Sequence, residues 1–199
     1  MALNSDKIIG ATILAAIPGI AAMSLVWGMG IFQNILLMLI FAALIDLIFL
    51  KLKAKPLAQY RKIYPSSALT ILLIAIGLPP AVTPGVLLVA CLASLGLARE
   101  AYGGIGRNVF NPAMVGYAVI FLAYPQQLAI WPSDLNGLSG ATLLTEFKYR
   151  DSLTISEFLS IHESANRSST LVACAFFLGG IFLLYKKIIT WHIPLTIMI

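Results

Sequence analysis

Residues 31–50 read IFQNILLMLIFAALIDLIFL, an apolar run of 20 residues with a single carboxylate. A helix of about 20 apolar residues crosses the hydrocarbon core of a bilayer. A comparable run occupies residues 8–27, and Gly28 and Gly30 lie between the two, where the chain must turn. The two runs predict a pair of membrane-spanning helices and hence an all-α, polytopic transmembrane bundle.

The composition of the whole chain also indicates a membrane protein. Of the 199 residues, 60% are hydrophobic and 11% are charged, and the mean hydropathy is +0.94. Soluble domains are about 45–50% apolar and about 25% charged. The net charge of +5 comes from basic residues in loops between apolar runs, without the basic stripe and interleaved aromatics of a nucleic-acid-binding surface. We therefore interpret residues 1–199 as a single membrane domain with no nucleic-acid partner.

Further apolar runs follow at residues 66–78, 85–98, 112 to about 125–131, and 169–185. Three prolines, at positions 79, 80 and 84, separate the first two of these runs, and each run is short for a complete span. They predict either a broken helix, which often marks a binding site, or a tight outer turn between two short helices. In total the sequence predicts about six spans.

The chain ends at residue 199 within another apolar run, which begins at residue 191. Nine residues are too few to cross a bilayer, so this run is a partial seventh span. We expect the chain to be the first part of a longer inverted-repeat membrane domain, or a truncated remnant without function.

Basic residues lie mostly in loops on one predicted side of the membrane. With the amino terminus inside, ten of the 13 basic residues are inside, five of them in the loop 51–65. The other three lie in the polar segment 126–168, within which residues 152–162 predict a short amphipathic helix. Because loops rich in Lys and Arg stay on the cytoplasmic side, we expect the segment 126–168 to be outside. This count requires two crossings within 66–98.

A glycine-rich segment precedes the run that begins at Pro112. Asn111 and Pro112 are typical of a helix start, as cap and first helical residue. Gly103, Gly104 and Gly106 superficially resemble a phosphate-binding loop, but a dinucleotide-binding loop follows a strand within a βαβ unit, and none is predicted here. We interpret the glycines as positions of close helix packing, with a flavin or subunit contact on the inner side as the alternative.

Few titratable side chains lie within the apolar runs. Asp46 is the only carboxylate inside a predicted span, which makes it a candidate for an ion path, although its place five residues before Lys51 favours the inner interface. Arg99 and Glu100 are interpreted as charges at the membrane interface. Cys91 and Cys174 are interpreted as buried apolar side chains, and the sequence has no motif for zinc or an iron–sulfur cluster.

The polar segment contains the sequence NGLSGAT, residues 136–142. Ser139, Gly140 and Ala141 have little bulk, which leaves room for a large group on the hydroxyl of Thr142. Taken alone, these residues are equally those of an ordinary loop turn.

The run YGGIGRNVFNPAMVGY, residues 102–117, resembles the D subunit of the Rnf electron-transport complex and, more distantly, the B subunit of the sodium-translocating NADH:quinone oxidoreductase. These families carry Gly-Gly-x-Gly-x-Asn-x-x-Asn-Pro-Ala before a membrane helix and Ser-Gly-Ala-Thr in the loop after it. This chain has both, in order and about 30 residues apart. Residues 67–70, 78–80 and 191–194 also resemble the family. The resemblance covers nearly the whole chain and about the first three fifths of a family member.

The resemblance implies a subunit of an ion-translocating electron-transport complex of the bacterial inner membrane, with the segment 126–168 periplasmic. In those families the motif threonine, here Thr142, carries FMN through a phosphoester bond. A second, non-covalent flavin is left open. The implied partners are a periplasmic flavoprotein subunit, iron–sulfur subunits, other polytopic subunits and a flavin transferase. Membrane lipid is a further expected partner of the apolar helices. The chain alone is not expected to be catalytic.

One departure from the family pattern concerns the attachment motif. Such motifs commonly carry Asp three residues before the serine, where this chain has Asn136, with Asp134 two residues earlier. We expect slower attachment of the flavin, or a substitute role for Asp134. The alternative function is a solute channel or transporter without a redox cofactor, because fold alone does not fix function.

Overall fold

A computed structural model describes residues 5–131, 148, 154–161 and 163–192. Helices account for the regular structure of these residues, which confirms the predicted all-α fold, and no strand element occurs among them. In chain order the α-helices are α1 (Ser5–Trp27), α2 (Gly30–Leu52), α3 (Tyr60–Ile76), α4 (Pro84–Cys91), α5 (Pro112–Ala123), α6 (Pro125–Ala129), α8 (Ile155–Ile161) and α9 (Glu163–Tyr185). A 3-10 turn, Leu57–Gln59, precedes α3, and a π-helix, Leu92–Glu100, continues α4.

Each of the six predicted apolar runs forms a helix in the structure. Among the described residues, three helical stretches are long and apolar enough to cross a membrane by themselves: Ser5–Trp27, Gly30–Leu52 and Arg167–Tyr185. Helix α5 is apolar but has only 12 residues. The predicted amphipathic helix at 152–162 corresponds to α8, and most of the partial run at 191–199 lies outside the described residues.

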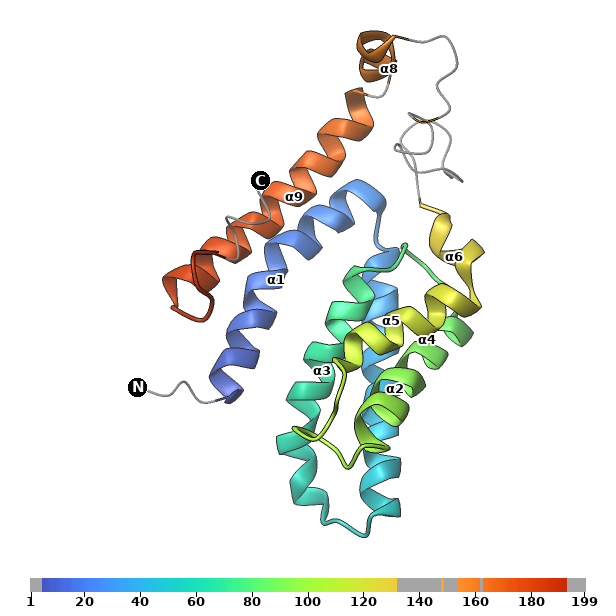
Figure 1. Cartoon of the computed structure of the whole chain (residues 1–199), viewed down its shortest axis with the longest axis vertical. Helices are drawn as coiled ribbons and strands as arrows, with labels where there is room; N and C mark the ends of the chain where they lie inside the picture. The colour runs from blue at the N-terminus through green and yellow to red at the C-terminus, as the bar shows by residue number, and fades with distance from the viewer. Residues whose placement is uncertain (1–4, 132–147, 149–153, 162, 193–199) are drawn as a thin grey trace.

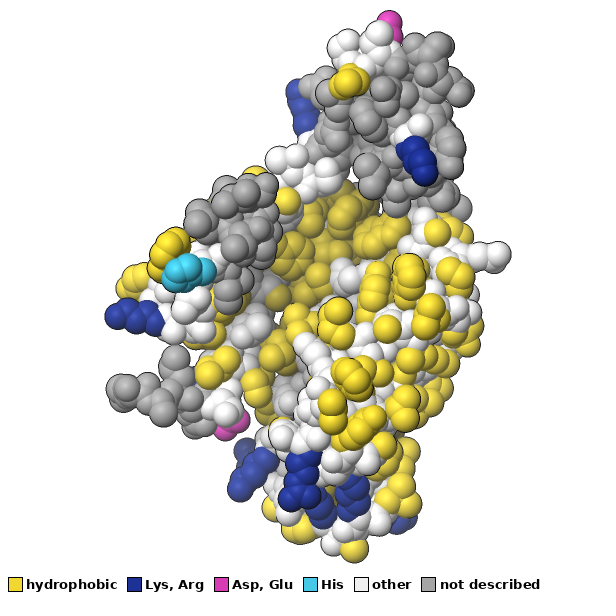
Figure 2. Space-filling model, viewed as in Figure 1, with side chains coloured by type: hydrophobic (Ala, Val, Ile, Leu, Met, Phe, Trp, Pro, Cys, Tyr) yellow, Lys and Arg dark blue, Asp and Glu magenta, His cyan; other side chains and the backbone are white. Residues whose placement is uncertain are grey.

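The helices form a bundle (Figure 1), and their buried apolar side chains form two cores. In the first core α2, α3, α4, the π-helix and α5 meet around fully buried side chains such as Met38, Ile71 and Leu87. In the second core α1 and α9 pack beside α2 and α3 around Met23 and Ile31. Figure 2 shows hydrophobic side chains over the middle of the visible face, and Lys and Arg gathered at the end where α2 and α3 are joined. A bilayer is the solvent that suits such an apolar outer surface.

Small residues let two pairs of helices approach closely. A side chain at Gly179 of α9 would collide with the backbone oxygen of Ala15 in α1. A side chain at Gly116 of α5 would lie 2.9 Å from the carbonyl oxygen of Ala90 and 2.8 Å from Cβ of Ser94. Close packing of this kind holds helices together in lipid, where the burial of apolar surface contributes little.

The contacts of a buried asparagine distinguish between the two predictions for residues 66–98, a broken helix or a turn between two short helices. Helices α3 and α4 run in opposite directions and are joined by a turn at residues 77–83 (Figure 1). The Asn34 side chain, fully buried in α2, donates to the backbone oxygen of Pro79 at 2.7 Å. Its Oδ1 accepts from the backbone nitrogen of Val82 at 3.1 Å. The prolines therefore lie in a turn between two separate helices, and a polar side chain inside α2 satisfies the polar groups of that turn.

Candidate functional site

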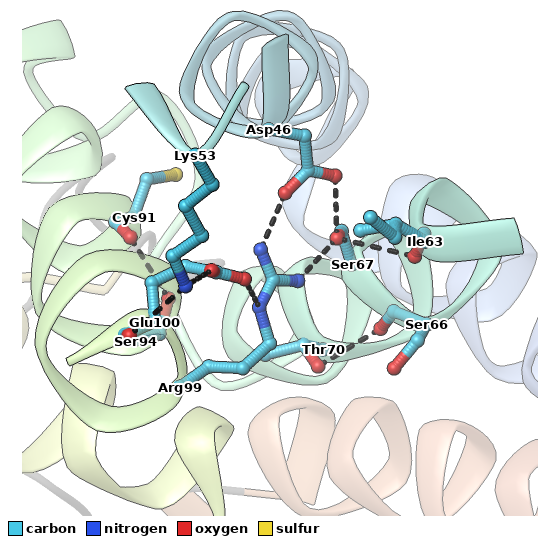
Figure 3. Close-up of polar contacts among 10 residues, drawn as sticks. All are labelled: Asp46, Lys53, Ile63, Ser66, Ser67, Thr70, Cys91, Ser94, Arg99 and Glu100. Carbon is cyan, nitrogen blue, oxygen red and sulfur yellow. Dashed lines mark hydrogen bonds and ion pairs between the residues drawn. The ribbon is translucent and has the colours of Figure 1, made fainter. Parts of the chain in front are cut away.

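Three helices meet at a buried ion pair. Asp46 on α2 and Arg99 near the end of the π-helix are joined by a bond of 2.5 Å from Nη2 to Oδ1, and the residues are 1% and 2% exposed. Ser67 on α3 donates to the other oxygen of Asp46 at 2.6 Å and accepts from Nη1 of Arg99 at 2.5 Å (Figure 3). The serine thus closes a ring of three side chains, and both oxygens of the carboxylate are hydrogen-bonded.

The ion pair continues outward through two more charged side chains. Nε of Arg99 donates to Oε1 of Glu100 at 3.0 Å, and the Lys53 ammonium contacts Oε2 of Glu100 at 2.5 Å (Figure 3). The order Asp46, Arg99, Glu100, Lys53 alternates in sign, so the four charges sum to zero. Burying a charge in a membrane is costly unless opposite charges and hydrogen bonds compensate it. In this cluster, each charged side chain contacts one of opposite sign, and Ser67 adds hydrogen bonds to the buried pair.

The wide turn of the π-helix presents Arg99 and Glu100 to the charged cluster. A π-helix is rare and commonly lies at a functional site. This π-helix extends over nine residues and ends at Glu100. Arg99 therefore faces α2 and α3, while Glu100 faces Lys53, just after the C-terminal end of α2. The Ser94 hydroxyl donates to the carbonyl oxygen of Cys91 at 3.2 Å within the same stretch. The backbone geometry therefore determines which side chains meet at the buried pair.

A cavity of about 340 Å³ adjoins this charged cluster. Its lining comes from the end of α2, the α2–α3 connection, the start of α3, the end of the π-helix and the glycine-rich loop. It consists of Asp46, Phe49, Leu50, Lys53, Lys55, Gln59, Ile63, Glu100, Gly103, Gly104, Ile105 and Arg107. The Lys53–Glu100 contact and this shared cavity bring residues 51–62 and 99–107 to one end of the bundle. That arrangement agrees with the two crossings within 66–98 that the count of basic residues required.

The glycine-rich loop differs from its predicted role in helix packing. Gly103, Gly104 and Gly106 have φ angles of +102°, +103° and +82°, a region that glycine adopts without strain. They form a tight turn after the π-helix, and close helix packing occurs instead at Gly116. The predicted start of α5 is confirmed, since Oδ1 of Asn111 accepts from the backbone nitrogen of Ala113 at 3.0 Å.

The predictions about single charged and cysteine residues have different outcomes. Arg99 and Glu100 were interpreted as charges at the membrane interface, and the structure adds that their side chains are only 3% and 9% exposed, within the paired cluster. Cys91 is buried as predicted, but Cys174 on α9 is exposed; both cysteines are free. Sequence analysis missed the partner of Asp46 because Arg99 is 53 residues away and lies near a predicted helix end. Ser67 and Asn34 were also missed, although each is a polar residue within an apolar run, which was the available signal.

The predicted attachment residues Ser139, Gly140, Ala141 and Thr142 lie outside the described residues, as does most of the segment 126–168. The described elements on either side of them are α6 and α8. Both lie toward the end of the molecule opposite to the α2–α3 connection (Figure 1). Trp131 is the last described residue before the attachment motif, and its ring packs against the ring of Trp27 at the end of α1, with the ring centroids 5.0 Å apart.

A sequence model of the NQR2, RnfD, RnfE family matches residues 2–199 of the chain. The chain belongs to this family. It is 32% identical to the D subunit of the ion-translocating oxidoreductase complex of Ectopseudomonas mendocina (strain ymp), over 96% of this chain and 62% of that protein. It is 32% identical to the D subunit from Alcanivorax borkumensis, over 96% of this chain and 63% of that protein. It is 28% identical to the D subunit from Cellvibrio japonicus, over 98% of this chain and 63% of that protein.

Membership of the NQR2, RnfD, RnfE family confirms the resemblance inferred from the glycine-rich and Ser-Gly-Ala-Thr motifs. The chain spans a little over three fifths of the length of these three relatives. Together with the apolar helices, the family match makes this chain a membrane protein.

Proposed function

We propose that this chain acts as a membrane subunit of an Rnf-type complex that couples electron transfer to ion translocation. The observation that carries the proposal is the family match over residues 2–199, with relatives named as the D subunit of an ion-translocating oxidoreductase complex. The chain supplies the membrane helices of such a subunit, and the complete reaction requires the other subunits of the complex.

The cofactor proposed for this chain is FMN, joined to Oγ1 of Thr142 through a phosphoester bond. FMN supplies the redox chemistry when bound, and the protein supplies its position and electrostatic surroundings. Gly140 and Ala141 give clearance around the threonine hydroxyl, and the Ser139 hydroxyl is suited to donate a hydrogen bond to a phosphate oxygen. Covalent attachment keeps the cofactor from diffusing away on the outer side of the membrane. A second, non-covalent flavin remains part of the proposal.

The proposed partners are a periplasmic flavoprotein subunit, iron–sulfur subunits, other polytopic subunits and a flavin transferase. The proposed location is the bacterial inner membrane, with the basic end of the bundle cytoplasmic and Thr142 periplasmic. This orientation is supported by the shared position of residues 51–62 and 99–107, because basic loops remain on the cytoplasmic side.

The test is covalent flavin in the denatured protein. Expressed with its flavin transferase, the chain should fluoresce in a denaturing gel and should gain one FMN phosphoester in intact mass. Thr142→Ala should remove both signals, and Thr142→Ser should retain part of them because a hydroxyl remains. Thr145→Ala is the matched control, since it makes the same change three residues along and should leave the flavin in place.

Two results would refute the assignment. Flavin that persists in Thr142→Ala would place the attachment elsewhere. Unmodified chain after expression with an active transferase would favour the solute channel or transporter, which needs no redox cofactor.

A further inference from the structure

The cavity beside the charged cluster has more positive than negative charge. Its carboxylates are Asp46 and Glu100, and both are already paired, with Arg99 and Lys53. Lys55 and Arg107 also line it, and within the described part of the chain no ion pair engages either side chain. The cavity therefore presents two cationic side chains to a ligand, in addition to the paired Asp46, Glu100 and Lys53.

The glycine turn helps to position one of these cations. The Arg107 backbone nitrogen donates to the carbonyl oxygen of Gly104 at 3.2 Å, which closes the turn. A Cβ at Gly103 would lie 3.2 Å from Cδ of Arg107, so the arginine stem packs directly over this glycine. Lys55 approaches from the α2–α3 connection, where Ala54 has a positive φ of 48°. Two separate turns thus bring cations to one cavity.

Part of the remaining lining is apolar, and this part continues onto the outer surface. Phe49, Leu50, Ile63 and Ile105 contribute to the cavity, and Ile105 is 49% exposed. Farther along the loop, Val109 and Phe110 are exposed apolar side chains. A ligand with an anionic head and hydrocarbon tails fits this combination, whereas a soluble anion would leave the apolar wall in contact with water.

We propose that this cavity is a site for an anionic phospholipid, with the phosphodiester bound by Lys55 and Arg107 and the hydrocarbon part against Ile63 and Ile105. Basic pockets at the ends of membrane helices are suited to such headgroups. Figure 2 shows further Lys and Arg side chains at this end of the bundle. Arg61, at the start of α3, does not line the cavity and would only raise the local concentration of anionic lipid. The site is independent of any flavin at Thr142 and of the redox role proposed above.

The test compares retained lipid in variants that lose equal charge. The full chain would be purified from bilayers with equal amounts of phosphatidylglycerol and phosphatidylcholine, and bound lipid would be counted by native mass spectrometry. Lys55→Gln with Arg107→Gln should lower phosphatidylglycerol retention about 25-fold, since each of the two basic side chains contributes about a fivefold gain. Arg61→Gln with Lys62→Gln, which removes the same charge outside the cavity, should change retention far less. Lys55→Arg with Arg107→Lys should retain the lipid.

Three results would overturn the proposal: equal losses in the two glutamine pairs, equal retention of both lipids by the wild-type chain, or displacement of the lipid by millimolar inorganic phosphate. The last would identify a site for a soluble phosphate. Protection of the buried Cys91 thiol from a maleimide should be the same in all variants, which shows that their bundles are intact.

Discussion

Replacing Arg99 by methionine is expected to destabilise the bundle much more than replacing Lys53 by methionine, although both changes remove one cation from the same cluster. Arg99→Met leaves the Asp46 carboxylate with only Ser67 as a hydrogen-bond donor, at a position that is 1% exposed. Removal of one member of a buried ion pair costs about 3–5 kcal/mol, because the remaining charge is uncompensated.

Lys53→Met has a smaller expected cost for two structural reasons. The Lys53 side chain is 31% exposed, so water already screens its charge, and Glu100 keeps its bond of 3.0 Å from Nε of Arg99. Exposed ion pairs contribute about 0–1 kcal/mol. The expected difference between the two variants in free energy of unfolding is therefore about 2–5 kcal/mol.

A double variant separates the uncompensated charge from simple loss of contacts. Asp46→Leu with Arg99→Met removes both charges and keeps apolar side chains of similar size. Such replacements are often neutral or stabilising, so the double variant should recover at least about 2 kcal/mol relative to Arg99→Met alone.

Unfolding would be followed in detergent micelles titrated with dodecyl sulfate, with maleimide labelling of Cys91 as the probe in a Cys174→Ser background. Cys91 is fully buried in the bundle and Cys174 is exposed, so only the former reports on unfolding. The reasoning is refuted if Arg99→Met and Lys53→Met have equal free energies of unfolding, or if the double variant is no more stable than Arg99→Met.

The remaining predictions concern the α3–α4 turn and the orientation of the chain. Asn34→Leu leaves one backbone oxygen and one backbone nitrogen of the turn without a hydrogen-bond partner, which should lower the free energy of unfolding by about 1–3 kcal/mol per group. Gln33→Leu, at the exposed neighbouring position, is the control and should change it by less than about 0.5 kcal/mol. Equal costs would contradict the role of Asn34. In a cysteine-free background on intact cells, an impermeant thiol reagent should label a cysteine at Asn136 and not one at Gln59, and the reverse pattern would exclude the proposed orientation.

The pairing of Asp46 with Arg99, 53 residues away, could not be predicted from local sequence patterns. Asp46 stood out as a carboxylate in an apolar run, and the bundle gives it a partner that sequence spacing does not indicate. Arg99 was interpreted only as a charge at the membrane interface. A π-helix adds a residue to each turn, so the side a residue faces at the end of such a helix departs from the 3.6-residue period used in prediction.

The sequence by itself determined the six helical segments, the cap of α5 and the family, because apolar run length, capping residues and motifs are local properties. Tertiary structure alone decided that Asp46, Ser67 and Arg99 contact one another and that Asn34 hydrogen-bonds to the α3–α4 turn. It also formed the cavity that Lys55 and Arg107 line. Those features depend on how helices distant in sequence pack and which way each side chain faces, and neither is encoded in the spacing of residues along one segment.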